Sequence, residues 1–448
     1  MEKLLKINKV ISNIVWGWPM MILLLGTGLF LMIKTKGIIF KQFPYIMKNT
    51  FMKMFSSGQD GDGDVSPFEA LSTALAATVG TGNIAGVSLA IATGGPGAVF
   101  WIWLSALLGM FTKYGEVVLA ITYREKNEKT GAYSGGPMYY LSKGANLPIL
   151  AILFAIFGMF ASFGIGNMTQ SNSITQALKS SFNFSPQIIG AIVTLLSALV
   201  LIGGIKKIAS FTSKLVPIMA MFYIVGAIIV IFINIRQIPS ALASIFKSAF
   251  TGQAAMGGFM GSTLMLTIKS GLSRGIFTNE AGLGSAPIAH SVAKTNHPVE
   301  QGMWGVYEVF ADTIVICTIT ALVVLTSGKW TTGLTGVELA TESFKTGFSL
   351  GGYVVSIALS LFAFSTIIGW YYYGERCFAY LFGDEHVLIY RLIYIPLTYV
   401  GAIGGLENIW DISDTLNGLM AIPNLIGLFL LSGVVAKKTA EYFSNIRK

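Results

Sequence analysis

Hydrophobic positions in this chain form blocks of about 18 to 25 residues, separated by short polar segments. A helix of that length crosses about 30 Å of hydrocarbon. The blocks lie at about residues 14–33, 67–91, 98–122, 148–178, 187–204, 212–233, 252–275, 300–327, 352–373, 387–403 and 413–435. The pattern predicts an all-α polytopic membrane protein with about eleven transmembrane helices. Long polar linkers are absent from the sequence, so residues 1–448 are expected to form a single membrane domain.

Composition agrees with this class. Of the 448 residues, 53% are hydrophobic and 11% are charged, against about 25% charged in ordinary globular proteins. This balance excludes a soluble enzyme. The formal net charge is +9, but the basic residues sit in short segments between apolar blocks and predict no nucleic-acid partner. The expected surroundings are a lipid bilayer.

Basic residues also predict the orientation of the chain. Loops that keep an excess of Lys and Arg lie on the cytoplasmic side of a membrane. When the first loop is placed inside, most basic residues of the later loops and of the C-terminal tail fall on the same side. We therefore expect a multi-pass protein of the cell membrane, with its N-terminus outside and its C-terminus in the cytoplasm.

The number of helices suggests an internal repeat. Setting aside an extra N-terminal helix at 14–33, ten helices divide into two sets of five, at 66–233 and 252–435. Because five is odd, the second set must enter the membrane from the opposite side. This is the arithmetic of a 5+5 inverted repeat, in which each half opens with a broken helix.

A first broken helix is expected near residue 80. It begins at Ser66-Pro67-Phe68-Glu69, a capping box with proline at the first helical position. About ten residues later, three glycines and three polar side chains occur within residues 76–86. Unwound backbone in a membrane is tolerated where it lines a cavity, and it can bind carboxylates through amides and cations through carbonyls.

A second interruption is predicted at Gly257–Thr263, which holds three further glycines at the matching position of the second half. Close helix packing through small residues is the alternative explanation for both segments.

Catalytic motifs are missing from the sequence. There is no HExxH, Walker or G-x-S-x-G motif. Residues 80–85 match the dinucleotide pattern G-x-G-x-x-A, but that motif needs a preceding strand and is discarded. We expect no enzyme activity and no cofactor.

Four stretches resemble the alanine/glycine:cation symporter family, also called the sodium:alanine symporters. They are Leu71 to Gly86 (LSTALAATVGTGNIAG), Tyr133 to Tyr140 (YSGGPMYY), Gly166 to Ser173 (GNMTQSNS) and Arg274 to Pro287 (RGIFTNEAGLGSAP). The one departure is Thr278, where the family usually has Ser, and the hydroxyl is kept.

The resemblance implies a fold of the leucine-transporter type and sodium-coupled uptake of alanine and glycine. The substrate carboxylate is expected at the amides of the first break, and the ammonium at carbonyls of both breaks. The implied substrate-binding residues are Thr78, Gly80, Thr81, Gly82, Asn83, Gln170, Gly258, Phe259, Gly261, Thr366 and Trp370.

The same resemblance implies a sodium site. It would combine backbone carbonyls with two hydroxyls, from Ala76, Val79, Phe362, Ser365 and Thr366. Oxygen ligands suit a hard cation. The alternative is that both hydroxyls bond within their own helix.

Three further features stand out. Trp370 follows Thr366 by four positions, so it shares a helix face with it and is expected to limit substrate size. The alternative is a Trp that only packs against neighbouring helices. Asp312 is the carboxylate expected deepest in the membrane, as a second ion or proton site or as a structural partner of Lys269. The polar segment 274–290 is interpreted as a cytoplasmic gate closed by ion pairs of Arg274 and Glu280, with a plain folded loop as the alternative. Lys113 is expected to be an i,i+3 partner of Glu116.

Other functions remain as alternatives: a proton-coupled amino-acid symporter, or a passive facilitator of small metabolites. A channel would favour a continuous polar lumen or rings of like charge. The sequence makes no prediction of oligomeric state.

Overall fold

The computed structural model describes residues 2–54, 61–128, 130–251, 264–404 and 407–446. These residues are mostly helical, as predicted. One short antiparallel hairpin pairs β1 (Glu125–Lys126) with β2 (Tyr133–Ser134), with Glu125 opposite Ser134.

In the described part of the chain, seven helices are long and apolar enough to cross a membrane, and two bent helix pairs bring the number to nine. The protein is therefore a multi-pass membrane protein. The total of eleven and the inverted repeat stay predictions, because part of the second predicted broken helix, 252–263, lies outside the described residues.

The N-terminal helices are α1 (Glu2–Val15), α2 (Trp18–Lys34), α3 (Ile38–Lys41), α4 (Phe43–Asn49) and the 3-10 turn η1 (Phe51–Lys53). The next set contains α5 (Pro67–Thr78), η2 (Gly82–Gly86), α6 (Val87–Gly94), α7 (Ala98–Thr122), α8 (Pro137–Tyr139), η3 (Tyr140–Gly144), α9 (Pro148–Phe163), η4 (Gly164–Met168), α10 (Thr169–Phe182), α11 (Pro186–Leu201), α12 (Gly204–Ile233), η5 (Ile235–Gln237) and α13 (Ile238–Thr251).

The last set contains α14 (Leu264–Asn279), α15 (Ala286–His290), α16 (Pro298–Val309), η6 (Phe310–Cys317), α17 (Thr318–Thr326), η7 (Lys329–Thr331), α18 (Gly336–Lys345), α19 (Gly351–Phe382), η8 (Asp384–His386), α20 (Val387–Ile403), α21 (Glu407–Leu430) and α22 (Ser432–Ile446). Segments η2, η3, η4 and η6 are π-helical.

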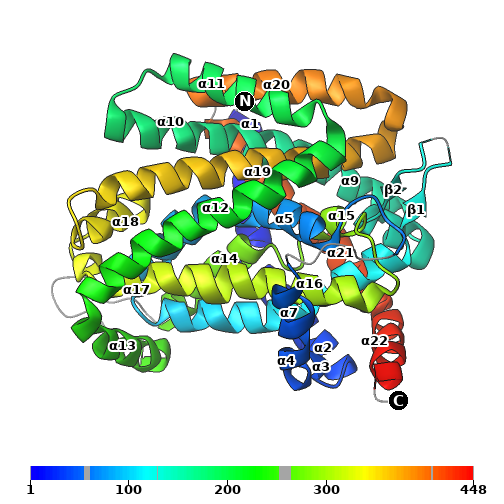
Figure 1. Cartoon of the computed structure of the whole chain (residues 1–448), viewed down its shortest axis with the longest axis horizontal. Helices are drawn as coiled ribbons and strands as arrows, with labels where there is room; N and C mark the ends of the chain where they lie inside the picture. Colours follow the sequence, from blue (N-terminus) through cyan, green and yellow to red (C-terminus); the bar gives the residue numbers. More distant parts are fainter. Residues whose placement is uncertain (1, 55–60, 129, 252–263, 405–406, 447–448) are drawn as a thin grey trace.

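The long helices lie roughly side by side. In Figure 1, α7, α12, α16 and α19 run across the view, with α18 near the left end and the β1–β2 hairpin near the right end. Helix α19 packs against α5, α9, α10 and α12, and α7 packs against α14 and α16. These contacts place α5 and α19 in the interior.

Helices α11 and α20 pack on each other at one edge of the molecule (Figure 1). Their outer faces carry exposed large apolar side chains, including Ile192 and Leu195 on α11 and Leu388 and Leu392 on α20. Helix α12 exposes a similar row, with Ile218, Met221, Val225, Ile228 and Phe232. Apolar faces this extensive are typical of contact with lipid rather than water.

Candidate substrate and ion site

The first helix break lies where the glycines predicted it. The predicted capping box is confirmed: the Ser66 hydroxyl accepts from the Glu69 amide, and the Glu69 carboxylate accepts from the Ser66 amide at 2.8 Å. Helix α5 then ends at Thr78, and the chain bends by 53° before continuing as η2 and α6. Residues 79–81 therefore interrupt the regular helix inside the protein, although the Val79 amide still donates to the Leu75 carbonyl at 2.8 Å and the Gly80 carbonyl accepts from the Asn83 amide at 3.3 Å.

A second break lies between α14 and α15, at residues 280–285. Its backbone is left-handed at Glu280 (φ 52°), Gly282 (φ 92°) and Gly284 (φ 84°). The two breaks oppose each other, because α5 packs against α15 and α6 packs against α14. The interruption predicted at 257–263 lies outside the described residues, and with it the predicted binding residues Gly258, Phe259 and Gly261.

The segment interpreted as a cytoplasmic gate thus contains this second break. Residues 275–293 are almost entirely buried. The expected ion pair between Arg274 and Glu280 does not form: the Glu280 carboxylate accepts from Trp370 Nε1 at 3.2 Å and from the Ser285 hydroxyl. A polar, glycine-rich segment is too hydrophilic to face lipid, but it can occupy the centre of a membrane protein.

A cavity of about 30 Å³ lies between the two breaks. Seven of the predicted substrate residues line it: Thr78, Gly80, Thr81, Gly82, Gln170, Thr366 and Trp370. The remaining lining residues are Ala77, Ile165, Phe277, Thr278, Glu280 and Asn417. Sequence reasoning missed these six, although the polar run at 277–280 was a signal for the second break.

Asn83, which was predicted to bind the substrate, lies outside the cavity. It is fully buried. Its side-chain oxygen accepts from the Gly80 amide at 2.9 Å, and its Nδ2 donates to the Asp312 carboxylate at 2.6 Å. Asn83 therefore braces the first break and links it to Asp312, and the Gly80 amide is already occupied.

Asp312 lies in η6 and is fully buried, as expected of a deep carboxylate. Besides Asn83, it accepts from the Thr313 hydroxyl at 2.7 Å. The alternative of a partnership with Lys269 is wrong, because Lys269 is exposed on α14.

The two helices that carry the predicted sodium ligands meet where α19 crosses the end of α5. A Cβ added at Gly369 would lie 2.8 Å from the Ala77 nitrogen, so the two helices touch there. Thr366 Oγ1 lies 3.0 Å from the Phe362 carbonyl and 3.5 Å from the Ala77 carbonyl. Ser365 also donates to the Phe362 carbonyl, at 2.8 Å, so both hydroxyls bond within their own helix, as the alternative interpretation predicted.

This donor set fits a hard cation. Ala76, Val79, Phe362, Ser365 and Thr366 are all buried. A hydroxyl that donates to a carbonyl keeps lone pairs on its oxygen for a cation. No group of three or more His, Cys, Asp or Glu side chains suited to a metal occurs among the described residues. A cation here would thus be held by backbone and hydroxyl oxygens.

Behind the second break lies a cluster of buried charges. Lys113 pairs with Glu308 at 3.3 Å, and Glu308 also contacts His290 at 2.9 Å. The expected pairing of Lys113 with Glu116 is wrong, because Glu116 Oε1 instead accepts from the amides of Gly282 and Gly284, each at 3.1 Å. Asn424 donates to the same oxygen at 2.5 Å. Glu116 therefore fixes the second break to α7 and α21.

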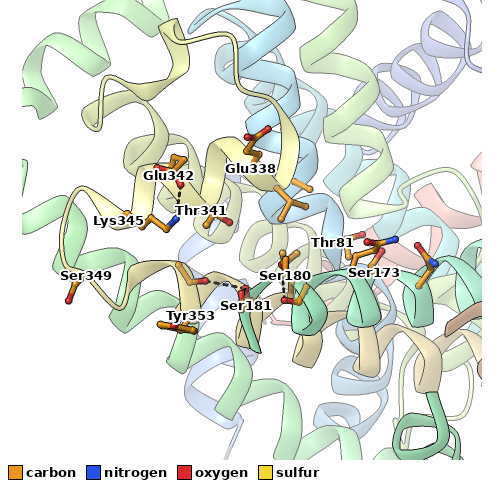
Figure 2. A pocket seen from close by; sticks show the side chains of 18 residues that line it. Thr81, Ser173, Ser180, Ser181, Glu338, Thr341, Glu342, Lys345, Ser349 and Tyr353 are labelled. Carbon is orange, nitrogen blue, oxygen red and sulfur yellow. Dashed lines mark hydrogen bonds and ion pairs between the residues drawn. The ribbon is translucent and has the colours of Figure 1, made fainter. Parts of the chain in front are cut away.

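On one side, a much larger cavity of about 830 Å³ leads towards this site. It lies between α10, α18 and α19 and is lined mainly by polar residues (Figure 2). In it, Lys345 pairs with Glu342 at 2.7 Å, and the hydroxyls of Ser181 and Ser356 are bonded to each other. Thr81 lines both cavities, so the large one ends at the first break.

The opposite side is closed by backbone pairing. Asp62 bridges to Thr295 and Val65 to Ala293. Arg124 ties the same strands together, donating to the carbonyls of Asp62 at 2.6 Å and Ala293 at 2.7 Å. Burial lowers the pKa of Arg124, with Tyr133 and two aspartates opposing the shift, and a guanidinium remains charged at neutral pH.

Comparisons with known proteins identify the family of this chain. A model of the sodium:alanine symporter family matches residues 1–448. The sodium/alanine symporter AgcS of Methanococcus maripaludis is 48% identical over 448 residues, which cover 98% of this chain and 97% of that protein. A putative sodium/proton-dependent alanine carrier protein of Bacillus subtilis, YrbD, is 37% identical, covering 94% and 89%.

Among solved structures, MhsT in complex with L-phenylalanine is similar in fold. The TM-score is 0.53 with 14% sequence identity, covering 85% of this chain and 99% of that one. At this identity the likeness concerns the fold alone.

Proposed function

The chain belongs to the sodium:alanine symporter family, and from that premise we propose that it carries small neutral amino acids, alanine and glycine, into the cell together with Na⁺. The family and the named relatives are transporters, so the protein is an amino-acid transporter and not an enzyme. The substrate pair, the coupling ion and the direction are the proposal.

One observation carries this proposal: a small cavity lies between two opposed helix breaks. Its volume of about 30 Å³ compares with about 10 to 15 Å³ needed for one water. Such a space favours the smallest amino acids, because overfilling a packed site costs about 1 to 3 kcal/mol.

The backbone amides and the oxygen atoms around the cavity suggest how the zwitterionic amino-acid substrate would be oriented. We assign the carboxylate to the amides of Thr81 and Gly82, since the Gly80 amide is bonded to Asn83. The ammonium would meet the carbonyl of Thr78 and buried amide oxygens. Among the described residues, the side-chain oxygens of Gln170 and Asn417 are buried without a hydrogen-bond partner.

Na⁺ is assigned to the oxygens of Ala76, Val79, Phe362, Ser365 and Thr366. Because Thr366 lines the cavity and also belongs to this donor set, ion and substrate would share one residue. Sharing a residue is a direct means of coupling, since each ligand then stabilises the arrangement that the other needs.

The position of the large cavity suggests that the structure is in an outward-facing conformation. With residues 66–233 and 252–435 as inverted repeats beside an extra N-terminal helix at 14–33, alternating access would open the two sides in turn. The 830 Å³ cavity would face outside, and the closed side that holds Arg124 would face the cytoplasm. The distribution of basic residues supports this orientation, with the N-terminus outside and the C-terminus inside.

Proton coupling is the second candidate. The observation that favours it is the buried Asp312, which is joined through Asn83 to the break. The relative named as a sodium/proton-dependent carrier supports keeping it. A passive facilitator is the third candidate.

The test is uptake of labelled L-alanine by purified protein in liposomes. An inward Na⁺ gradient is compared with K⁺ or choline, each with and without a pH gradient. We expect accumulation above equilibrium only with Na⁺. Accumulation driven by pH alone, and lost in Asp312→Asn, would establish the proton-coupled alternative. Equilibration without accumulation under every gradient would establish a facilitator.

A further inference from the structure

The Trp370 ring is held on three sides. It is 3% exposed and lines the small cavity from α19. One side of the residue lies on Gly166, where an added Cβ would be 2.5 Å from Trp370 Cβ and 2.7 Å from its Cγ. The ring of Tyr373 contacts it edge-on at 5.6 Å between centroids. The third contact is polar: Trp370 Nε1 donates to Glu280 Oε1 at 3.2 Å.

Glu280 is itself fixed in place. It follows the last residue of α14 in a left-handed conformation (φ 52°), which is uncommon for a residue other than glycine. Its amide donates to the Ile276 carbonyl at 3.0 Å. Its second carboxylate oxygen accepts from the hydroxyl of Ser285, which is fully buried at the start of α15. The acceptor for the indole is thus anchored at both ends of the second break.

We propose that Glu280, held by Ser285, is a positioning residue that fixes the Trp370 ring and thereby sets the upper size limit of the substrate. The inference rests on the proposed function, because it places the substrate side chain at the Trp370 end of the cavity. An indole has a single hydrogen-bond donor, so one acceptor decides which orientation of the ring is satisfied. Without that acceptor, one of the three contacts that hold the ring is lost, and a shift of the ring would enlarge the cavity.

In this arrangement, the size limit for the substrate depends on the position of the second break. Trp370 belongs to α19, whereas Glu280 and Ser285 belong to the break between α14 and α15. A movement of the break during transport would carry the acceptor away from the indole. The size limit is then strict only while the cavity is closed.

The experiment compares substrate profiles, not rates alone. Wild type and the variants Trp370→Phe, Glu280→Ala, Glu280→Gln and Ser285→Ala are reconstituted in liposomes. Uptake of labelled alanine is measured against unlabelled valine, leucine and glutamine as competitors. Trp370→Phe keeps an aromatic ring and removes the indole N–H group. Glu280→Gln keeps an oxygen that accepts from the indole.

We expect Trp370→Phe and Glu280→Ala to let valine compete at about tenfold lower concentration than in wild type, as loss of one hydrogen bond to a carboxylate predicts. Glu280→Gln should keep the wild-type size limit, and Ser285→Ala should fall between. A double variant that combines Trp370→Phe with Glu280→Ala should relax the limit no further than either single variant, since both substitutions remove the same contact.

Trp103→Phe is the matched control. Trp103 Nε1 donates to the Thr318 hydroxyl at 2.8 Å, between α7 and α17, and Trp103 does not line the cavity. The same chemical change there should leave the profile unaltered. Trp370→Phe and Glu280→Ala proteins that transport alanine with the wild-type size limit would overturn the inference and leave the proposed function standing. Failure of wild type to transport alanine would instead overturn the proposed function.

Discussion

At the residue scale, buried side chains satisfy the backbone groups that the helix breaks set free. Asn83 accepts from the Gly80 amide in the first break, and Glu116 accepts from two glycine amides in the second. A buried amide without an acceptor costs about 1 to 3 kcal/mol. These braces therefore hold the cavity in shape before any ligand binds.

Replacing Asn83 by Ala should weaken substrate binding. The Gly80 amide and the Asp312 carboxylate each lose a partner, so the first break loosens. We expect the KM for alanine uptake to rise about tenfold. Concentration-dependent uptake in liposomes measures this. Asn49→Ala is the control, because Asn49 donates only to the Tyr45 carbonyl in the described structure, within α4. An unchanged KM in Asn83→Ala would show that the brace is dispensable.

Replacing Gly369 by Ala should impair the proposed cation site. The new methyl group would lie 2.8 Å from the Ala77 nitrogen and would push α19 away from α5. We expect the Na⁺ concentration for half-maximal uptake to rise at least severalfold, with a destabilisation of about 1 to 3 kcal/mol.

The matched control is Gly352→Ala on the same helix. There the nearest atoms belong to the flexible Lys345 side chain, at 3.0 Å, and the Na⁺ dependence should stay as in wild type. Equal Na⁺ dependence in both variants would argue against a cation site between α5 and α19.

Residues on uninterrupted helices were the predictable ones. Thr366 and Trp370 line the same cavity, as their spacing of four on α19 predicted. Asn83 was assigned to the substrate by resemblance, but it lies in the π-helical η2 and its side chain donates to Asp312. Helical periodicity cannot place a side chain where the periodicity itself changes.

At the scale of elements, the two breaks differ in how they are built. The first is a short gap of residues 79–81 between α5 and η2, whereas the second spans 280–285 and leads into the short α15. The first was recognised from a capping box followed by glycines. The second was hidden because residues 274–290 read as a loop, and no local pattern tells a surface loop from unwound backbone enclosed by other helices.

Removing the Glu116 carboxylate should release the second break. In Glu116→Ala, the amides of Gly282 and Gly284 lose their acceptor, and Asn424 Nδ2 keeps only the Gly282 carbonyl. We expect a loss of about 3 kcal/mol or more of stability. Thermal unfolding in detergent measures it as a lower Tm.

Glu116→Gln keeps one oxygen for the glycine amides and should lie between Glu116→Ala and wild type. A Tm for Glu116→Ala equal to that of wild type would mean that the break needs no clamp.

At the scale of the whole molecule, one side is open to the first break and the other is closed. The large cavity ends at Thr81, while the paired segments at Asp62–Thr295 and Val65–Ala293 seal the opposite side. Arg124 joins these segments to the β1–β2 hairpin, where its guanidinium lies 4.6 Å from the Tyr133 ring. Asp64 joins them as well, by accepting from the Tyr133 amide at 2.7 Å.

Replacing Arg124 by Ala should favour opening of the sealed side. The parent protein for this test carries Ser291→Cys as a reporter of accessibility. Its two native cysteines, Cys317 and Cys377, are buried free thiols and are replaced by Ala, so that the introduced thiol alone can react. We expect a membrane-impermeant maleimide to react with the introduced thiol several times faster when Arg124→Ala is added to the parent. Lys126→Ala, on the same hairpin, is the control. Equal reactivity of the parent, the Arg124→Ala protein and the Lys126→Ala protein would show that Arg124 does not help to keep this side closed.

The membrane class and the helical content followed from block length and charge alone. The closure did not, because it depends on bridges between Asp62 and Thr295 and between Val65 and Ala293, which lie more than 200 residues apart and carry no sequence pattern.

Three π-helical segments adjoin the site: η2 holds Gly82, η4 holds Ile165 and η6 holds Asp312. A π-helical turn contains one residue more than an α-helical turn. Removing that residue restores a regular helix, and adding one there is absorbed locally. Relatives that gain or lose a single residue inside the membrane should therefore do so in these segments, so that insertions and deletions in this family are expected beside the ligand and not only in the loops.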